Sequence, residues 1–492
     1  MRFACSLLLL CTSLGNASPP AKQPAPLPAM LVGTGVHFGP GKADVSAFLS
    51  QNRVLGTNTF RTDVAWWDLE EVRDQLRFPA RLAPLEQAID ATVAAGGAPL
   101  LILDYGNQFH DNGSFPVSEE AQAAFVRYVR FVVSRFKGRV RHYEVWNEWN
   151  IGLATGHPVP YTYEGSARDY ARLLGKVHAA IKAIDPGAVV IAGALANRDI
   201  AWMREMTAAA GGTYDAISVH PYNFAARGAA RTPEEVIQWI RGFRDALPIG
   251  PDQTRPPIYI TEIGWPTHLG RHGTPEQMVA QYLARLLLLA RETGFIKGVW
   301  WYDYQDDGDN PSEPEHHFGI VTRNGAPKPA FQAMRALASR VATARSASLR
   351  VASDGVLALQ LHLADGTALL AAWSTTGEAG SSLHLASQSD TVTLRASASG
   401  AVTSVQTFRV GKGLPPRPIS LSGTPLLITG DLRGVTVVTA PAVDTLPERL
   451  WLRLLQRMQA LHKCCRAAQN QQMSRNPNES MFKCRIGLKE TF

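Results

Sequence analysis

Short apolar runs alternate with stretches of helical spacing from Leu31 to about Ser339. After each run come polar residues, and then apolar residues three or four positions apart, the pattern of an amphipathic helix. In residues 118–138, for example, four large apolar side chains share one helical face between a serine and a glycine. The runs that predict strands are Leu31–Phe38, Thr57–Thr62, Pro99–Leu103, Val140–Trp146, Val189–Gly193, Ala216–His220, Ile258–Glu262 and Gly298–Tyr302.

Eight strand–helix units within about 300 residues predict a closed (β/α)8 barrel over residues 31–343. An open dinucleotide-binding sheet fits less well, because no G-x-G-x-x-G motif follows a strand. Two helix starts, Thr232–Glu235 and Thr274–Gln277, combine a threonine, a proline and an acid or amide. They predict reciprocal caps with proline at the first helical position.

After about Ala344 the apolar spacing changes to two. Val356–Leu363 and Ala368–Trp373 flank an Asp-Gly pair, which predicts a β-hairpin. We therefore expect a small all-β sandwich over residues 344–444. Its single tryptophan, Trp373, could bind carbohydrate, but we expect this region to be a packing partner of the barrel. Further strand-like runs are Thr391–Leu394, Val405–Val410 and Val435–Thr439.

The two ends of the chain differ from its body. Residues 1–17 predict a secretory signal peptide, and residues 18–30 a Pro-rich linker, so we expect a secreted or periplasmic protein. Residues 445–492 hold nine basic and three acidic residues, and thus six of the seven net positive charges. The nearly neutral body argues against a nucleic-acid partner. The tail is either a basic amphipathic helix at a membrane surface or an extension without selected function, and its composition favours the second.

Cysteine placement limits the chemistry of the main fold. The five cysteines lie within the first dozen residues or in the tail, which excludes a disulfide framework, thiol catalysis and a thiolate metal site from the residues between. The acidic segment after the last predicted barrel strand does not match an EF-hand loop, and no H-E-x-x-H motif occurs. We expect neither a metal nor an organic cofactor. The sequence does not predict the oligomeric state.

Two glutamates close predicted strands four and seven. Reactive groups of a parallel barrel lie at the carboxyl ends of its strands, and there the sequence places Glu148 and Glu262. Retaining hydrolysis of a glycosidic bond needs one carboxylate to attack the anomeric carbon and one carboxylic acid to protonate the departing oxygen, about 5–5.5 Å apart. A lone glutamate after a strand is more often a cap or a solvated residue. This pair is accompanied by Asn147, His220 and Tyr222 at strand ends, which favours catalysis.

The motifs at these strand ends resemble those of clan A retaining glycoside hydrolases, and in particular of family 39-like proteins. They are LDYGN, VWNEWN, VHPY, TEIGWPT and WWYDYQDDG. Within the family, bacterial hydrolases of exopolysaccharide and biofilm matrix are the most similar in character. The resemblance covers about residues 31–339 well and the β region loosely, and it does not extend to the tail. Trp149 departs from the pattern, since many family members have proline there.

The resemblance implies a role for each of the polar residues at these strand ends. Glu148 would be the general acid/base and Glu262 the nucleophile. Asn147 would hold the sugar 2-hydroxyl, a bond that strengthens as positive charge grows on the ring. Tyr222 would donate to Glu262, and His220 would order Glu148 or the sugar.

Further contacts are expected from basic and aromatic residues. Arg61 would reach the nucleophile and favour its charged form. Trp301, in preference to Trp300, would form the floor of the reacting subsite. His37 is either a hydrogen-bonded barrel histidine or a substrate contact. Aromatic rings stack against apolar faces of sugars, so we expect at least one platform among the remaining candidates, Trp66, Trp67, Trp149 and Trp265.

Together these patterns predict an exported retaining β-glycosidase that cleaves an oligo- or polysaccharide by double displacement. We expect the substrate to be an exopolysaccharide and the cleavage to occur within its chains. Two alternatives stay open. One is an exo-acting β-xylosidase-like enzyme, and the other is a catalytically silent glycan-binding or matrix protein on the same scaffold. Retention of Asn147 and Tyr222 beside both glutamates favours an active enzyme over the silent protein.

Overall fold

The computed structural model describes residues 26–38, 42–153, 166–250, 253–353, 355–376, 381–387, 391–399 and 405–440. The expectations for the signal peptide, for most of the linker and for the tail from residue 445 lie outside these residues. Among the described residues, every helix is too short or too polar to cross a membrane.

Eight parallel strands of the described chain close into a barrel, in which each strand pairs with the next and β8 returns to β1. All eight predicted strands are confirmed, with ends that shift by up to three residues. The strands are β1 (Leu31–Gly35), β2 (Thr59–Asp63), β3 (Leu100–Leu103), β4 (His142–Val145), β5 (Val189–Leu195), β6 (Ala216–Val219), β7 (Ile258–Ile263) and β8 (Ile296–Trp301).

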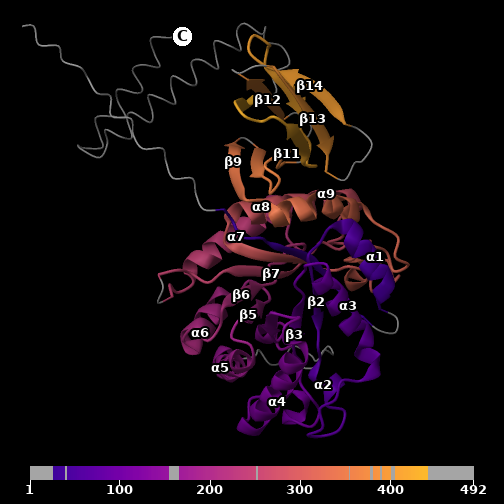
Figure 1. Ribbon diagram of the computed structural model, residues 1–492, viewed down its shortest axis with the longest axis vertical. Coiled ribbons are helices and arrows are strands. Elements are labelled where there is room, and N and C mark those ends of the chain that lie inside the picture. Colours follow the sequence, from indigo (N-terminus) through magenta and orange to yellow (C-terminus); the bar gives the residue numbers. More distant parts are fainter. Residues whose placement is uncertain are drawn as a thin grey trace, which may run out of the picture.

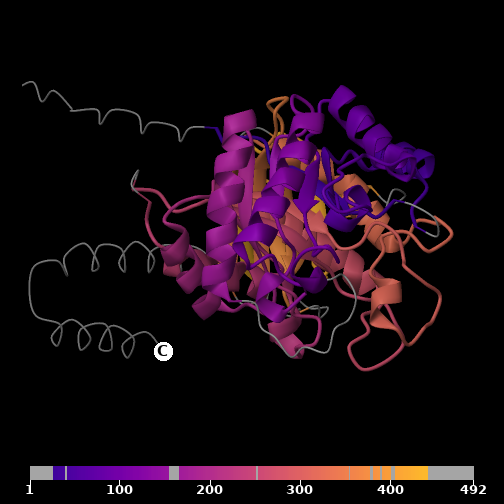
Figure 2. The ribbon, with the colours of Figure 1, turned by 90° about the horizontal axis from the view of Figure 1, so that it is seen from below.

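Helices surround the strands (Figures 1 and 2). The longer helices bury an apolar face. The pattern read in residues 118–138 is confirmed, because the predicted apolar face of α4 is buried and Ser118 caps its first turn. The helices are α1 (Val45–Leu55), α2 (Trp66–Leu69), α3 (Ala83–Ala94), α4 (Glu119–Phe136), α5 (Ala167–Ile184), α6 (Ile200–Ala210), α7 (Pro233–Ala246), α8 (Glu276–Thr293) and α9 (Pro329–Thr343).

The two predicted reciprocal caps are wrong, although proline does begin α7. Thr232 precedes that helix, but its hydroxyl donates to the carbonyl of Ala229 instead of accepting from the first turn. Helix α8 begins at Glu276, and the Thr274 hydroxyl accepts a hydrogen bond from Arg231. The Thr232 hydroxyl is thus bound to a carbonyl before the helix, and the Thr274 hydroxyl to an arginine 43 residues away in the sequence, so neither caps a first turn.

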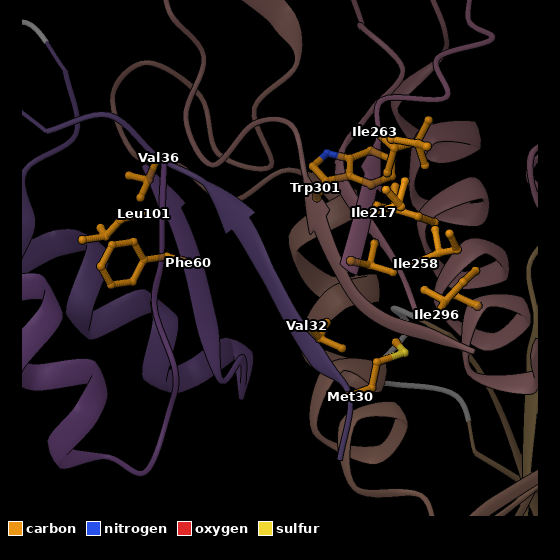
Figure 3. Close-up of a cluster of buried hydrophobic side chains, with 14 of the residues drawn as sticks. Met30, Val32, Val36, Phe60, Leu101, Ile217, Ile258, Ile263, Ile296 and Trp301 are labelled. Atoms are coloured by element: carbon orange, nitrogen blue, oxygen red, sulfur yellow. The ribbon is translucent and has the colours of Figure 1, made fainter. Parts of the chain in front are cut away.

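Neighbouring residues of a strand point to opposite sides of the barrel wall. Trp300 fills the barrel interior, where its indole Nε1 donates to Thr59 Oγ1 at 3.2 Å. Trp301 lies on the other side of the wall, beside Ile263 in the aliphatic layer between strands and helices (Figure 3). The barrel is therefore a packed core, and strand residues face a cleft at its open end.

Antiparallel strands follow the barrel and form the expected all-β sandwich. In the described chain one sheet has the order β14-β13-β16-β11-β10-β9 and the other β15-β12-β17. The predicted hairpin is confirmed as the β10–β11 pair. The strands are β9 (Ser346–Ser353), β10 (Val356–His362), β11 (Ala368–Ser374), β12 (Ser382–Ser387), β13 (Val392–Ala398), β14 (Gln406–Val410), β15 (Arg417–Ser420), β16 (Leu426–Gly430) and β17 (Val435–Ala440).

The larger sheet joins the sandwich to the barrel, because it buries both of its faces. One face, with Ala358 and Leu370, packs on the smaller sheet. The opposite face, with Leu361 and Trp373, belongs to the same core as the barrel and lies over α8 and α9 (Figure 1). Trp373 is fully buried and therefore packs between the two parts, as expected, instead of serving as a surface platform for carbohydrate.

A buried polar contact fixes this junction. The Trp373 indole Nε1 donates to Glu234 Oε1 at 2.8 Å, and the same carboxylate accepts from Arg285 Nε at 2.8 Å. Glu234 belongs to α7 and Arg285 to α8, so one carboxylate joins two barrel helices to the β-sheet.

We predict that Trp373→Ala lowers the free energy of unfolding by about 3–5 kcal/mol, the usual cost of removing a buried aromatic side chain. It also leaves Glu234 with one donor fewer. Urea unfolding measures the change. Val405→Ala, at a position 57% exposed in the same β region, is the control and should change stability by less than about 0.5 kcal/mol. A loss below about 1 kcal/mol for Trp373→Ala would show that the junction contributes little.

Candidate active site

A cleft of about 570 Å³ opens at the carboxyl ends of the barrel strands. Its lining includes six of the nine predicted site residues. Barrel strands and the turns that follow them supply most of the remaining lining, so the cleft is where this fold is expected to place a reactive site. The lining residues are His37, Arg61, Asp63, Tyr105, Asn147, Glu148, Ile151, Gly152, Leu153, Ala196, Asn197, Tyr222, Phe224, Glu262, Tyr302, Glu315 and Phe318.

Glu148 and Glu262 approach each other across this cleft. One oxygen of each carboxyl group and one ring nitrogen of His220 all lie within 4.8 Å of one another. The two side chains keep 17% and 11% of their surface exposed, so both are accessible from the cleft but largely shielded from water. This separation suits a retaining double displacement, in which both carboxyl groups act on one anomeric centre.

Backbone geometry and a buried histidine hold Glu148 in place. It follows β4 in a left-handed conformation (φ 47°), which residues with a side chain rarely adopt and which is often found at functional sites. His220 Nδ1 lies 2.8 Å from Glu148 Oε1 and 3.6 Å from Glu262 Oε2. Its other nitrogen, Nε2, lies 3.1 Å from Thr261 Oγ1, so the fully buried ring is held at both ends.

Glu262 is surrounded by donors that favour its charged form. Arg61 Nη1 donates to Oε1 at 2.7 Å, and the Tyr222 hydroxyl donates to Oε2 at 2.9 Å. Burial raises the pKa of Glu262. The charges of His220 and Arg61 and the bond from Tyr222 outweigh it and hold the pKa below the usual carboxyl value. At neutral pH Glu262 is therefore a carboxylate, and its hydrogen bonds to Arg61 and Tyr222 fix its orientation.

Arg61 connects three acceptors from one buried position. Besides Glu262, its Nε donates to Glu144 Oε2 at 2.6 Å and its Nη2 donates to Asn147 Oδ1 at 3.0 Å. The Asn147 amide nitrogen then donates to the Tyr105 hydroxyl at 2.9 Å, which fixes the orientation of the amide. Glu144 is fully buried and was missed by the sequence analysis. An acid in the middle of the apolar strand β4 was the signal that could have found it.

His37 lines the cleft as half of an ion pair. Its Nδ1 lies 3.0 Å from Asp63 Oδ2, and 37% of its side chain is exposed. Burial lowers the pKa of His37, but the hydrogen bond to Asp63 and the charges of Asp63 and Asp303 outweigh it and raise the pKa to about 9. His37 is thus both a hydrogen-bonded barrel histidine and a cleft residue, which joins the two readings of the sequence.

Two predicted aromatic contacts do not reach the cleft. Trp149 is fully buried, with its ring 4.0 Å from that of Phe115, and Trp301 is buried with its ring 5.7 Å from that of Trp265. Tyr302 lines the cleft instead. It shares the side of β8 on which Trp300 lies; the two-residue period of a strand groups these two residues, but only the structure shows that their side faces the barrel interior. The platform and floor roles expected of Trp149 and Trp301 are therefore corrected.

Within the described part of the chain, two clusters of side chains have ligand atoms close enough to hold a cation. In the first, both Glu70 oxygens already accept hydrogen bonds, from the Trp66 indole at 2.6 Å and the Asp74 backbone N–H at 2.7 Å, so this carboxylate is satisfied without a metal. The second consists of Glu148, His220 and Glu262. There the Arg61 guanidinium already neutralises Glu262 and would repel a second cation. The donor sets do not favour a metal at either position.

We predict that the His37–Asp63 pair contributes stability that depends on pH. The folded-state pKa lies above the usual value of 6.5, so the contribution is fully present below about pH 6.5 and is lost as the pH rises through about 9. The difference in unfolding free energy between the wild type and His37→Gln should be larger at about pH 6 than at about pH 10 by urea unfolding. Asp63→Asn should remove this dependence, and a difference that does not change with pH would contradict the assignment.

Comparison with known proteins gives structural relatives only. No family model matches the chain, and no curated protein matches its sequence. The structure is similar to a family 39 glycoside hydrolase from the gut symbiont Bacteroides cellulosilyticus WH2, with a TM-score of 0.65 and 24% identity over 82% of this chain and 81% of that chain. It is also similar to the catalytic domain of the GH30 xylanase C from Talaromyces cellulolyticus, with a TM-score of 0.56 and 14% identity over 82% and 98% of the two chains. A GH30 endoxylanase from Clostridium papyrosolvens C71 is similar as well, with a TM-score of 0.57 and 10% identity over 82% of this chain and 97% of that chain. The chain therefore has a barrel fold of the kind found in glycoside hydrolases of families 39 and 30.

Proposed function

We propose that this protein is a retaining glycoside hydrolase of clan A, similar to family 39, with Glu148 and Glu262 as its catalytic residues. The observation that carries the proposal is the approach of these two carboxyl groups to within 4.8 Å in one cleft, with Glu262 held by Arg61 and Tyr222. The structural relatives support it, since they are glycoside hydrolases on the same fold.

The proposed reaction has two steps. Glu262 attacks the anomeric carbon while Glu148 gives its proton to the departing glycosidic oxygen, so one C–O bond forms as the other breaks. The product of this step is a glycosyl ester of Glu262. Glu148, now a carboxylate, takes a proton from water, which attacks the same carbon and releases Glu262. The two inversions retain the anomeric configuration.

The surrounding residues fit this sequence of events. The Arg61 and Tyr222 bonds keep Glu262 charged and aimed before the attack. His220, which is held at both ends, positions Glu148 without a direct role in bond breaking. Asn147, which Arg61 and Tyr105 orient, lies where its amide can hold the 2-hydroxyl of the reacting sugar.

We further propose that the substrate is a β-linked oligo- or polysaccharide and that the enzyme cleaves it within the chain. We also propose that the enzyme is exported and that its natural substrate is an exopolysaccharide outside the cell. Tyr222, Phe224, Tyr302 and Phe318 give the cleft an aromatic wall suited to sugar rings. Two of the structural relatives are described as a xylanase and an endoxylanase. The exo-acting β-xylosidase-like alternative differs in products, and the silent glycan-binding alternative predicts no hydrolysis.

Replacing each glutamate should reveal a different role. Glu262→Gln removes the nucleophile and should abolish turnover. Glu148→Gln should lower kcat/KM for natural glycans by about 10²–10⁴-fold, because the leaving oxygen is no longer protonated. It should still react once with an aryl glycoside, whose leaving group needs no proton, and accumulate a glycosyl-enzyme that mass spectrometry detects.

The matched control is Glu313→Gln, an exposed acid on the loop that also carries cleft residue Glu315. It should keep wild-type activity. Proton NMR of the first-formed product should show the retained anomer. An inverted product, or equal activity in all three variants, would remove the proposal.

The buried Glu144 should tune the nucleophile through Arg61. It shares the guanidinium with Glu262, so Glu144→Gln leaves the positive charge of Arg61 to act more fully on Glu262. The pKa of Glu262 should then fall further, and the acidic limb of the kcat/KM pH profile should move to lower pH. Where the folded fraction is constant across the pH range, the position of the limb does not depend on it, so it separates this effect from the destabilisation that follows the loss of a buried pair. An unshifted acidic limb would contradict the coupling.

A further inference from the structure

We propose that Trp67, supported by Tyr105, is a binding platform for a sugar ring adjacent to the one whose bond is cleaved. This inference rests on the proposed function and extends it to the length of glycan that the site takes. The sequence predicts a platform among several tryptophans without selecting one. Exposure, anchoring and contact with the reaction centre together select Trp67.

Trp67 differs from the other tryptophans by its exposure. It keeps 37% of its surface accessible and is the only tryptophan among the exposed large apolar side chains of the described chain. Its neighbour Trp66 and the other two candidates, Trp149 and Trp265, are completely buried. An accessible indole beside a cleft offers a flat apolar face, which matches the C–H face of a pyranose ring.

Buried contacts of Trp66 and Glu70 hold the short helix α2, which carries Trp67, in place. The Trp66 indole Nε1 donates to Glu70 Oε2 at 2.6 Å, and its ring stacks on His110 at 4.8 Å with an interplanar angle of 7°. Glu70 in turn lies 2.9 Å from His110 Nε2. Trp67 is therefore presented by a fixed segment, so that binding a sugar costs little ordering of the protein.

Trp67 is also connected to the reaction centre by direct contacts. Its ring stacks on that of Tyr105, with centroids 5.4 Å apart and an interplanar angle of 6°. Tyr105 lines the cleft and accepts a hydrogen bond from Asn147, which Arg61 links to Glu262. Trp67 thus lies one aromatic ring beyond the position at which Asn147 would hold the reacting sugar.

This position has a consequence for the substrate. Glu148 must face the departing oxygen, whereas the contacts of Trp67 run through Tyr105 and Asn147 to Arg61 and the nucleophile, so we assign Trp67 to the side of the sugar that becomes attached to Glu262. An enzyme that removes single terminal units has no use for a binding surface there. The geometry points to a β-linked glycan that continues past the reacting unit toward its non-reducing end, which is cleavage within the chain.

The experiment compares a long and a short substrate of the same sugar. Xylohexaose and β-1,4-mannohexaose are the long probes, and para-nitrophenyl β-xyloside and β-mannoside are the short ones. Trp67→Ala should lower kcat/KM for the hydrolysed hexasaccharide by about three- to tenfold, the range expected for one aromatic stacking contact. It should lower kcat/KM for the aryl glycoside by a clearly smaller factor, and Trp67→Phe should restore most of the activity on the hexasaccharide. Val72→Ala, at an exposed apolar position a few residues on, is the surface control.

Three results would overturn the platform. They are unchanged hexasaccharide hydrolysis in Trp67→Ala, an equal loss on the long and short substrates, and the release of single units from the non-reducing end by the wild type. A different result would reject the proposed function itself. If Glu262→Gln hydrolyses both substrates, the catalytic assignment fails whatever the effect of Trp67→Ala. If Glu262→Gln is inactive but Trp67→Ala hydrolyses the hexasaccharide like the wild type, only the platform is rejected.

Discussion

The guanidinium of Arg61, buried at the centre of the barrel mouth, determines how the site is built. Its three hydrogen-bonding nitrogens reach Glu144, Glu262 and Asn147, so one side chain of β2 joins the ends of β4 and β7. An isolated buried charge would cost several kcal/mol. Here each charge is paired, and the planar fork of arginine can satisfy acceptors in different directions. The strands that carry the two carboxyl groups must therefore stay in register with Arg61.

The distribution of aromatic side chains separates stability from recognition. Fully buried tryptophans such as Trp149, Trp301 and Trp373 fill the layers between strands, helices and the β-sheet. Tyrosine and phenylalanine instead form the aromatic part of the cleft wall. A tyrosine can combine an apolar face with a hydroxyl that holds a polar neighbour, as Tyr222 does for Glu262 and Tyr105 for Asn147. A wall of tyrosines can therefore offer apolar faces to the cleft, suited to the proposed sugar, and at the same time position the polar side chains beside it.

The β region contributes from a distance. Its larger sheet buries Leu361 and Trp373 in the same core as the barrel helices, so the two parts share one hydrophobic interior. Glu234 completes the junction by accepting hydrogen bonds from Trp373 and Arg285. The cleft lining contains no residue of the described β region. The role of the sheet that follows from these contacts is to support α7 and α8, which flank the strand that carries Glu262.

The sequence by itself determined the order of strands and helices, the change to a β region and the strand ends at which Glu148 and Glu262 lie. These features follow from local periodicity, which a single chain displays without reference to distant residues. Tertiary structure alone decided that Tyr302 replaces Trp301 in the cleft, that Glu144 shares Arg61 and that Glu234 binds Trp373 and Arg285. Each of these outcomes depends on a partner far along the chain, and the free energy of burying and pairing polar groups exceeds the local preference that the sequence expresses.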